Sequence, residues 1–468
     1  MQEPLVPKVE WVDAAASERG TCPLCGLDDQ KRVVLRARHW VEERGALTLL
    51  ACRDCGSAFF LESGLHEQYP DDLGRLEDPN FALLIHHYVE STAGLDWKVP
   101  LLESMPFERF ARVLEIGCSV GVAIDYCRVA WGAHARGLEP SAYGAAGAAQ
   151  FGFPVERRFV QELPEDDLYD LIYATEVLEH VEDPRAFLAA IEKRLAPSGM
   201  VLITTPRAEN VTRSARPGDL YATLSAGAHR FIPSRGALEG LLADAGFQHL
   251  QWFATGNSQV VVATKDASFE LRKVTDTPAR LRRYYELKLE AEALDARFAL
   301  HLAIDAFQCA VDLGDFAGAA THRDRIDATL RSDWDLDLDR PEALARRLRD
   351  VDSIFGFGAL VPFGLPLYLF ARGHLDGGPR SPKGGRMFAA CALVCLHGLR
   401  VDFQNLFAYH AYFERALSAA TTSLRHAPRR STLRLLAEVV SVRQELPELR
   451  HPRDRLASAV VHRLRLGV

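Results

Sequence analysis

The sequence predicts an α/β protein with a largely parallel sheet, preceded by a small cysteine-rich module and followed by an all-helical module. Three observations support this prediction: a glycine-bearing turn after an apolar run, two C-x-x-C pairs near the N-terminus, and apolar positions at helical spacing in several segments after residue 265. At 468 residues the chain exceeds one ordinary core, so two or three domains are expected.

The glycine-bearing turn at 113–121 reads VLEIGCSVG. Its apolar residues predict a buried parallel strand, Gly117 and Gly121 allow a tight turn, and the residues that follow can start a helix. Glu139 ends the next apolar run. An acid about 20 residues past such a turn lies beside it in the sheet and can accept hydrogen bonds from both ribose hydroxyls. The segment therefore predicts a nucleoside pocket.

The turn departs from the G-x-G-x-x-G pattern of dinucleotide-binding proteins. Ser119 takes the place of the middle glycine, and Glu115 precedes the first glycine by two. An acid there would place negative charge close to a pyrophosphate, whereas it suits a cation. On these residues the sequence resembles class I S-adenosylmethionine-dependent methyltransferases, whose cofactor is a nucleoside with a sulfonium and an amino-acid tail. In that family the acid of the first motif lies near the amino-acid end of the cofactor, and Glu115 matches it.

The resemblance covers about residues 106–265 and continues through LYDLIYATEVLEHVEDP at 168–184 and GMVLITTPRAEN at 199–210. It implies a Rossmann-like class I methyltransferase sheet with a final hairpin and with strands at 112–116, 135–138, 155–159, 171–175 and 199–205. In many relatives a polar segment after the third strand contacts adenine; this chain has FVQELP there, so Gln161 or Glu162 would substitute. The expected cofactor-binding residues are Glu115, Gly117, Cys118, Gly121, Glu139, Gln161 and Thr175.

Methyl transfer from a sulfonium is an in-line displacement, so the protein must position the acceptor and, for a hydroxyl or an acidic carbon, remove a proton. The acceptor is expected beyond the carboxyl ends of the strands. Histidine titrates near neutrality, so His180 in TEVLEH and His229 before RFIPS are equal candidates for the base. In the family's EVLEHV segment the histidine is often a structural or cofactor-side residue, which is the alternative for His180. Further candidates near the acceptor are Glu179, predicted as catalytic, and Glu176, Asn210 and Tyr221.

Two C-x-x-C pairs, each followed by glycine, are typical of a zinc ribbon; the ligands would be Cys22, Cys25, Cys52 and Cys55. Four thiolates satisfy zinc without leaving an open position, so one structural zinc ion is predicted. A redox dithiol is the competing interpretation. The other five cysteines lie in apolar or turn settings and are expected to be inert buried thiols.

The predicted domains are a zinc ribbon at 1–62, a helical linker or lid at 63–105, the methyltransferase domain at 106–265, and a helical, tetratricopeptide-like module at 266–468. In the linker, IHHYVE at 85–90 would either cover the cofactor or form a surface helix. The apolar stretch 354–370 approaches the length of a membrane span, but its prolines and glycines favour a buried helix-turn-helix over membrane contact. The glycine-rich segment 372–386 is expected to be an exposed loop.

Composition limits the partners that the chain can have. A net charge of -8 and a pI near 6.1 oppose a general nucleic-acid-binding surface. The N-terminus lacks a basic-then-apolar signal pattern, so a cytoplasmic location is expected. The helical module is expected to support homodimerisation or to bind a protein partner.

A four-cysteine module joined to this fold is similar to two known arrangements, the sugar-nucleotide C-methyltransferases of deoxysugar pathways and a group of ribosomal RNA guanine methyltransferases. The first usually carries a further C-terminal α/β domain, which this sequence does not show, so the likeness stops near residue 265. The preferred interpretation is methylation, on oxygen or carbon, of a small hydroxylated metabolite such as a sugar nucleotide or a natural-product intermediate. The alternatives are an RNA methyltransferase and a cofactor-binding scaffold that recruits a protein partner through its helical module.

Overall fold

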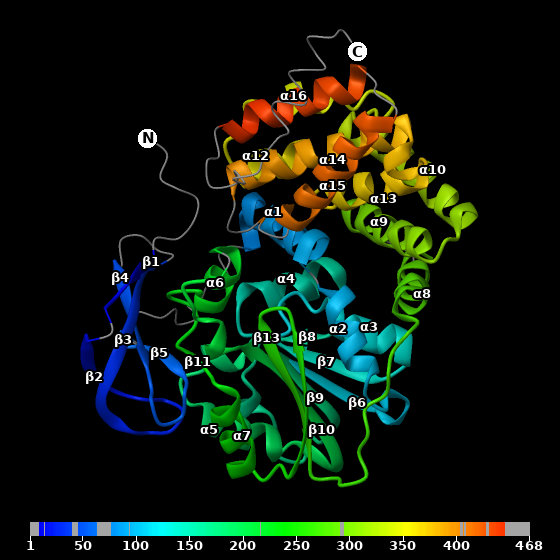
Figure 1. The fold of residues 1–468 in the computed structure, drawn as a ribbon. Helices are drawn as coiled ribbons and strands as arrows, with labels where there is room; N and C mark the ends of the chain where they lie inside the picture. The colour runs from blue at the N-terminus through cyan, green and yellow to red at the C-terminus, as the bar shows by residue number, and fades with distance from the viewer. Residues whose placement is uncertain are drawn as a thin grey trace. The chain divides into compact units, whose positions relative to one another are not determined.

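The computed structural model describes residues 9–13, 15–39, 45–62, 76–92, 94–215, 217–290, 294–402, 406, 409–426 and 430–444. The chain divides into two compact units (Figure 1). We call residues 6–76 and 100–274 the sheet unit, and residues 1–5, 77–99 and 275–468 the helical unit. Residues 77–99, which the sequence places in a linker or lid, thus belong with the C-terminal helices.

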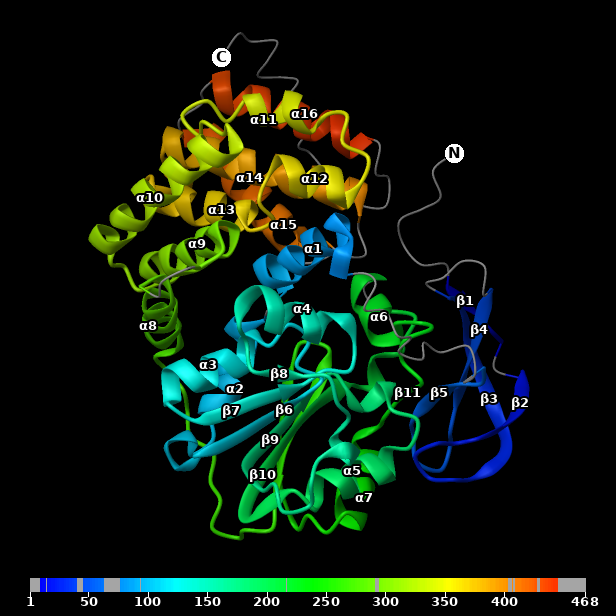
Figure 2. The ribbon, with the colours of Figure 1, turned by 180° about the vertical axis from the view of Figure 1, so that it is seen from behind.

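A seven-stranded sheet forms the centre of the sheet unit, in the order β12-β13-β10-β9-β6-β7-β8 (Figure 2). The five strands β6 to β10 are parallel, and β13 runs antiparallel to both β10 and β12. This confirms the predicted Rossmann-like sheet and its final hairpin, although the third strand is shorter than predicted. The bounds are β6 (Arg112–Ile116), β7 (His134–Leu138), β8 (Val155–Glu156), β9 (Tyr169–Thr175), β10 (Leu195–Pro206), β12 (His249–Thr255) and β13 (Ser258–Thr264).

Helices cover both faces of this sheet, which explains why its strands are apolar runs rather than alternating patterns. Leu114, Ile172 and Ile203 project to one face and join a core with the apolar side chains of α5 and α7. On the other face, α3 and α4 contact β6, β7 and β8. The helices and 3-10 turns are α3 (Val122–Trp131), α4 (Ala142–Phe151), α5 (Pro184–Glu192), α6 (Pro217–Leu224), α7 (Arg235–Asp244), η5 (Phe107–Arg109), η6 (Val160–Glu162), η7 (Leu178–His180) and η8 (Ala208–Asn210).

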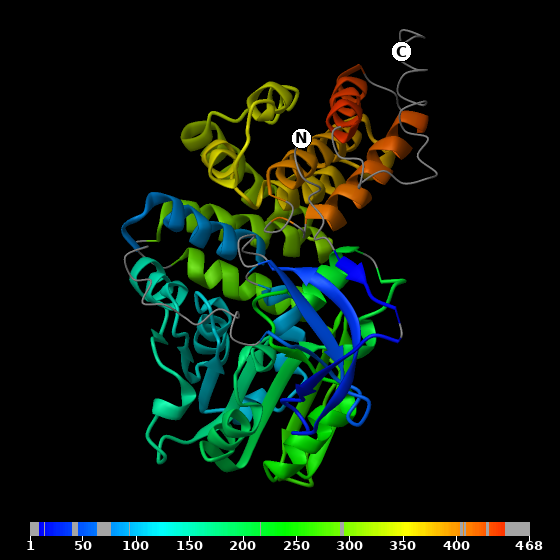
Figure 3. The same cartoon turned by 90° about the vertical axis from the view of Figure 1, so that its left-hand side faces the viewer.

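The cysteine-rich module forms a second sheet in the same unit, with strand order β1-β3-β4-β5-β11 and with β2 paired to β3 (Figure 3). Its first five strands are β1 (Val9–Trp11), β2 (Ser17–Thr21), β3 (Asp28–Arg38), β4 (Ala46–Ala51) and β5 (Ala58–Phe60). The edge strand β11 (Phe231–Ile232) comes from much later in the chain: Phe231 pairs with Phe59 and Ile232 with Ala58. The cysteine-rich module therefore forms one hydrogen-bonded sheet with a strand from a later part of the sheet unit.

The helical unit is organised around α14, which contacts α11, α12, α13, α15 and α16. Its sequence is apolar on all sides, as expected of a central helix. Gly385 permits close packing against α15, because a Cβ there would lie 1.9 Å from Ser423 Oγ. The elements are α1 (Pro79–His87), η4 (Tyr88–Thr92), α2 (Leu95–Glu103, shared with the sheet unit), α8 (Thr277–Leu289), α9 (Ala296–Asp312), α10 (Phe316–Trp334), α11 (Ala343–Leu348), α12 (Ile354–Leu360), α13 (Leu365–Leu375), η9 (Gly378–Arg380), α14 (Pro382–Val401), α15 (Tyr409–His426) and α16 (Arg430–Gln444).

The apolar stretch 354–370 forms the predicted helix-turn-helix, and Phe357, Phe363 and Leu369 are fully buried or nearly so. Within the described ranges no single helix is long and apolar enough to cross a bilayer; α12 and α13 pass that test only as a pair, bent by 46°. The prediction of an exposed loop at 372–386 is wrong, since α13 ends and α14 begins within this segment. Ser381 caps α14 by accepting hydrogen bonds from Lys383 and Gly384, and Gly384 and Gly385 are buried within this helix.

Candidate active site

The glycine turn between β6 and α3 has the backbone that a nucleoside pocket needs. Gly117 and Gly121 have φ values of +67° and +98°, and Ser119 also adopts a positive φ of 50°. Neither glycine tolerates a side chain: a Cβ on Gly117 would lie 2.4 Å from Val177 Cγ2, and one on Gly121 would lie 2.5 Å from Val155 Cγ2. The first contact places the loop after β9 directly against the turn.

Glu139 lies beside this turn, at the carboxyl end of β7. It is largely buried, and its two oxygens accept hydrogen bonds from the backbone N–H groups of Ser119 (3.0 Å) and Ser141 (3.1 Å). Each carboxylate oxygen has a second lone pair. The carboxylate is therefore fixed in place and retains the capacity to accept hydrogen bonds from a pair of ribose hydroxyls.

Glu115 is fully buried in β6, on the opposite sheet face from Leu114. The hydroxyl of Tyr173 in β9 donates a hydrogen bond to its carboxylate at 3.0 Å. Burial, together with the nearby Cys127 and Glu115, raises the pKa of Tyr173 well above its usual value, so this hydroxyl remains a proton donor. Sequence reasoning missed Tyr173, because it reads as one more apolar position of a buried strand.

The other predicted cofactor-binding residues have different surroundings. Cys118 is buried, and its backbone N–H donates to Leu138 O at 3.2 Å. Thr175, at the end of β9, has a buried hydroxyl for which no hydrogen-bond partner is found among the residues described. Gln161 is exposed in η6, and the carboxylate of Glu162 accepts a local hydrogen bond from Phe159 N at 2.6 Å. The predicted roles of these residues in binding adenine and the amino-acid tail stay predictions.

The three predicted catalytic residues lie together beyond β9. Glu179 and His180 are in η7, and His229 reaches them from the loop before β11. The rings of His180 and His229 meet edge to face, with centroids 4.8 Å apart, and His229 Nε2 lies 3.8 Å from Glu179 Oε1. Their ligand atoms all fall within 4.8 Å of one another, so the group could also hold a metal ion.

Backbone carbonyls orient both imidazoles. Nδ1 of His180 lies 3.1 Å from Ala228 O, and Nδ1 of His229 lies 2.9 Å from Thr223 O. A carbonyl can only accept, so Nδ1 carries the proton in each ring and Nε2 carries the lone pair in a neutral ring. His180 is only partly buried, whereas Glu179 and His229 are enclosed.

Burial dominates the electrostatics of this cluster. It raises the pKa of Glu179 well above its usual value, and the adjacent charge of Glu176 adds to the shift. Burial also lowers the pKa of His180 to about 4; the charge of Arg230 adds to this effect, while the hydrogen bond to Ala228 opposes it. At neutral pH the cluster therefore contains an unprotonated His180 beside a carboxyl group that resists ionisation.

The remaining candidates are held by local contacts. Glu176 has a positive φ of 55° and accepts a hydrogen bond from Thr204 Oγ1 at 2.6 Å. Asn210 donates to Asn257 O at 2.6 Å, and Tyr221 is half-buried in α6. His86, His87 and Tyr88 belong to the helical unit, where the buried His87 ring packs edge-on against Phe363, with centroids 4.9 Å apart.

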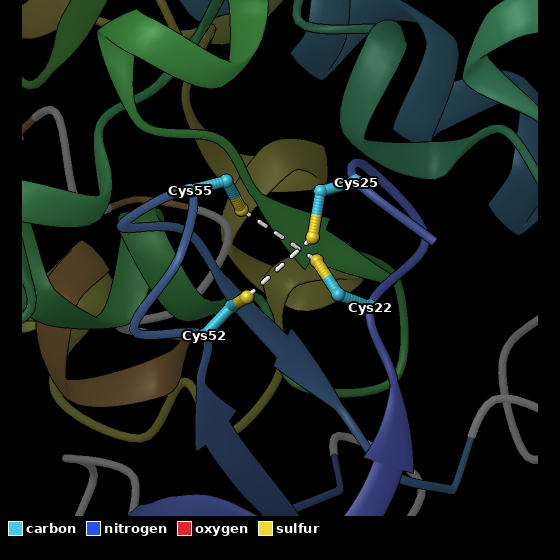
Figure 4. Close-up of side chains that lie close together, drawn as sticks. All are labelled: Cys22, Cys25, Cys52 and Cys55. Carbon is cyan, nitrogen blue, oxygen red and sulfur yellow. Dashed lines mark hydrogen bonds between the residues drawn. The ribbon is translucent and has the colours of Figure 1, made fainter. Parts of the chain in front are cut away.

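The four predicted metal ligands converge on one point, from the turns after β2 and β4 (Figure 4). The Sγ atoms of Cys22 and Cys55 are 3.7 Å apart, and those of Cys25 and Cys52 are 3.6 Å apart. A tetrahedral zinc site with Zn–S bonds of about 2.3 Å requires sulfurs about 3.8 Å apart. The donor set and its spacing therefore fit zinc.

Two further residues connect this cluster to its surroundings, and sequence reasoning missed both. Lys31 is almost fully buried next to the sulfurs; burial would lower its pKa, but Asp29 and Cys52 raise it, so it stays cationic beside the cysteine cluster. Ser234 caps α7 and donates from its hydroxyl to Cys55 O. Nothing in the sequence around a lysine or a serine indicates that the residue makes such contacts.

Comparisons with known proteins show which sequences and structures this chain resembles. Residues 87–251 match the family model described as "Methyltransferase domain". A ubiquinone biosynthesis O-methyltransferase of Rhodopseudomonas palustris (strain HaA2) is 33% identical over 101 residues, which cover 20% of this chain and 39% of that protein. Phosphoethanolamine N-methyltransferase 1 of Zea mays is 25% identical over 175 residues, which cover 34% of this chain and 32% of that protein.

Among solved structures, human N-acetylserotonin methyltransferase in complex with SAM aligns with a TM-score of 0.35 and 17% identity, over 43% of this chain and 64% of that chain. The chain spans only about two fifths of the ubiquinone biosynthesis O-methyltransferase that it matches. The family match includes the glycine turn, Glu139, His180 in η7 and His229 in the loop before β11. Residues 87–251 are therefore similar to a methyltransferase domain, and the sheet unit has the Rossmann-like class I fold.

Proposed function

We propose that the protein is an S-adenosylmethionine-dependent methyltransferase that acts on a hydroxyl group of a small metabolite. The observation that carries this proposal is the contact between the glycine turn and the segment after β9 that leads to His180. Val177, which packs against Gly117, precedes His180 by three residues. A donor held by Glu139 and an acceptor next to His180 would thus meet at one edge of the sheet.

The protein's own residues supply binding, orientation and proton transfer. S-adenosylmethionine, when bound, supplies a methyl group activated by the sulfonium. Glu139 would accept hydrogen bonds from its ribose hydroxyls. His180 would take the proton of the acceptor hydroxyl on Nε2, since this histidine is unprotonated at neutral pH and partly accessible. Glu179 and His229, which are enclosed, would hold the His180 ring in its orientation.

We also propose that the four cysteines hold one structural zinc ion. The sulfur spacing supports zinc, and four thiolate ligands leave no open coordination position. An RNA-directed role for this module is less well supported. The carbonyls of Leu24 and Cys55 accept hydrogen bonds from Arg185 and Ser234 of the same chain, and the net charge of the protein is -8.

The acceptor class is inferred from the base, since a hydroxyl must lose a proton whereas an amine can attack unaided. Sugar nucleotides and hydroxylated natural-product intermediates fit this requirement and the predicted class of small hydroxylated metabolites. Carbon methylation of an acidic C–H would use the same base. The cytoplasmic location and a partner for the helical unit stay predictions.

The test begins with calorimetric binding of S-adenosylmethionine, followed by mass-spectrometric detection of methyl transfer to panels of sugar nucleotides, phenols and short RNAs. His180→Asn is the informative variant, because its amide can still donate to Ala228 O while Nε2 is lost. We expect donor affinity to persist and turnover to fall at least a hundredfold. Wild-type turnover in His180→Asn would refute the assignment of His180 as the base. If S-adenosylmethionine does not bind, the proposed methyltransferase activity is refuted. If methyl transfer is detected only to RNA, and RNA binding weakens steeply as the salt concentration rises, the acceptor is RNA and not a small metabolite.

A further inference from the structure

One segment of the sheet unit connects the cysteine cluster to the predicted catalytic residues. We call residues 223–234 the strap; it contains His229 and the edge strand β11. On one side it is hydrogen-bonded to the cysteine-rich module, and on the other to η7 and its histidine. All of these contacts lie within a single compact unit.

The strap is hydrogen-bonded to the cysteine-rich module through both main-chain and serine side-chain groups. Ser234 N donates to Ser57 Oγ at 2.9 Å, Ser234 Oγ donates to Cys55 O, and Phe60 N donates to Arg230 O at 3.0 Å. Gly227 lies against the buried His39, since a Cβ at Gly227 would be 2.4 Å from His39 Nε2. The path of the strap is therefore set by the residues that follow the second cysteine pair and by the end of β3.

The contacts of the strap with the catalytic residues are equally direct. Arg230 N donates to Glu179 O at 2.8 Å, and Arg230 Nε donates to His180 O at 3.1 Å. Ala228 O accepts from Nδ1 of His180, which fixes the tautomer of that ring. A shift of the strap would thus rotate or release His180 and carry His229 away from Glu179.

We infer that the metal-bound cysteine module is a positioning element for the methyl-transfer site, acting through the strap. The positioning residues are Gly227, Arg230 and Ser234, none of which needs to touch substrate. The four cysteines would hold the zinc ion and so would close the turn that carries Cys55. This turn and β5 hold the strap, and the strap orients His180 and His229. Release of the metal would lower turnover while the donor pocket around Glu139 persists. This inference rests on the proposed function for its link to catalysis, but the mechanical coupling can be tested without turnover.

The first experiment removes zinc from the full-length protein with a chelator and follows backbone hydrogen exchange by mass spectrometry. We expect exchange in 223–234 and 176–182 to accelerate at least tenfold, with strands β6 and β9 unchanged, and zinc addition to restore protection. Unchanged protection of the strap after complete zinc release would overturn the inference. If the protein transfers no methyl group at all, the proposed function fails while this measurement still decides the coupling.

The second experiment keeps the cysteines intact and covers the case in which the metal-free chain unfolds as a whole. Gly227→Ala places a methyl group against His39, and Gly246→Ala is the matched control. Gly246 has a similar positive φ of +92°, and the nearest atom to a new Cβ, Lys265 Cε, is 3.8 Å away. We expect Gly227→Ala to retain zinc and donor affinity while kcat falls about tenfold, a barrier increase of about 1.4 kcal/mol.

The imidazole resonances of His180 should also shift in Gly227→Ala but not in Gly246→Ala, and adding His39→Ala should restore part of the turnover. Equal turnover and unshifted histidine resonances in Gly227→Ala and Gly246→Ala would overturn the inference. Loss of donor affinity in Gly227→Ala would also contradict it, since the strap would then support the cofactor pocket instead.

Discussion

The carboxylate of Glu139 accepts a hydrogen bond from the backbone N–H of Ser119 at 3.0 Å, although 20 residues separate them in the sequence. This bond joins the end of β7 to the glycine turn after β6. The turn and the acid thus form one rigid unit before any ligand binds. Such preorganisation reduces the cost of binding, because few groups need to be ordered by the ligand.

Glu139→Gln should weaken binding of S-adenosylmethionine. The change removes a charged acceptor, and a hydrogen bond to a charged group contributes about 1.5–3 kcal/mol, so Kd should rise roughly tenfold to a hundredfold. Calorimetry checks this. Glu156→Gln is the control, since Glu156 is half-exposed on the neighbouring strand and pairs with Arg136. Equal affinity in both variants would contradict the pocket assigned to Glu139.

Gly117→Ala should destabilise the protein more than Gly132→Ala. The two glycines have φ values of +67° and +69°, so alanine experiences similar backbone strain at either site. Only Gly117 faces Val177, whereas nothing lies within 4 Å of a Cβ on Gly132. We expect a loss of about 1 kcal/mol for Gly132→Ala and of about 2–4 kcal/mol for Gly117→Ala, measured by urea unfolding.

A comparison with Val177→Ala tests the cause of that difference. The double variant Gly117→Ala with Val177→Ala should recover part of the stability lost in Gly117→Ala, because the clash is removed and only the strain of positive φ remains. Strictly additive losses would show that the steric contact is not responsible.

His180 should make the protein less stable in acid. The pKa of His180 is lowered to about 4 by burial, while the unfolded chain titrates near 6.5. Below pH 6.5 the unfolded state therefore binds a proton that the folded state does not. Stability should be full above about pH 6.5 and fall, by at most about 1.4 kcal/mol per pH unit for this group, as the pH decreases toward 4.

His180→Asn is expected to flatten this dependence over the same range, as measured by urea midpoints between pH 4 and 7. His134→Asn is the control, because His134 is exposed at the start of β7. An unchanged slope in His180→Asn would show that the ring is protonated in the folded protein.

Arg297→Met should strongly destabilise the helical unit. Arg297 forms an ion pair with Glu90, which is almost fully buried and also accepts a hydrogen bond from Gly364 N at 3.3 Å. Burial raises the pKa of Glu90, while the charge of Arg297 opposes this rise. Removing one partner of a buried pair costs about 3–5 kcal/mol.

Thermal unfolding of Arg297→Met measures that cost. Arg323→Met is the control, since its pair with Asp324 is exposed and should contribute below about 1 kcal/mol. A similar melting temperature for the two variants would contradict a structural role for Glu90 and Arg297.

The sequence predicted the parts of the site that local patterns encode. The turn with Gly117 and Gly121, the acid at Glu139 and the grouping of Glu179 with His180 all follow from strand ends that share one edge of a parallel sheet. The four cysteines follow from their paired spacing. By contrast, the predicted loop at 372–386 was wrong, because glycines that usually break helices here allow α14 to pack closely against its neighbours.

Local pattern alone therefore determined the fold class, the glycine turn and the two cysteine pairs, since each depends on residues close together along the chain. Only the tertiary structure decided that His229 meets His180, that Ser234 reaches Cys55, and that His87 packs against Phe363. These pairs are separated by 49, 179 and 276 positions. Contacts over such separations arise from the burial of whole elements, and no single residue type marks them in advance.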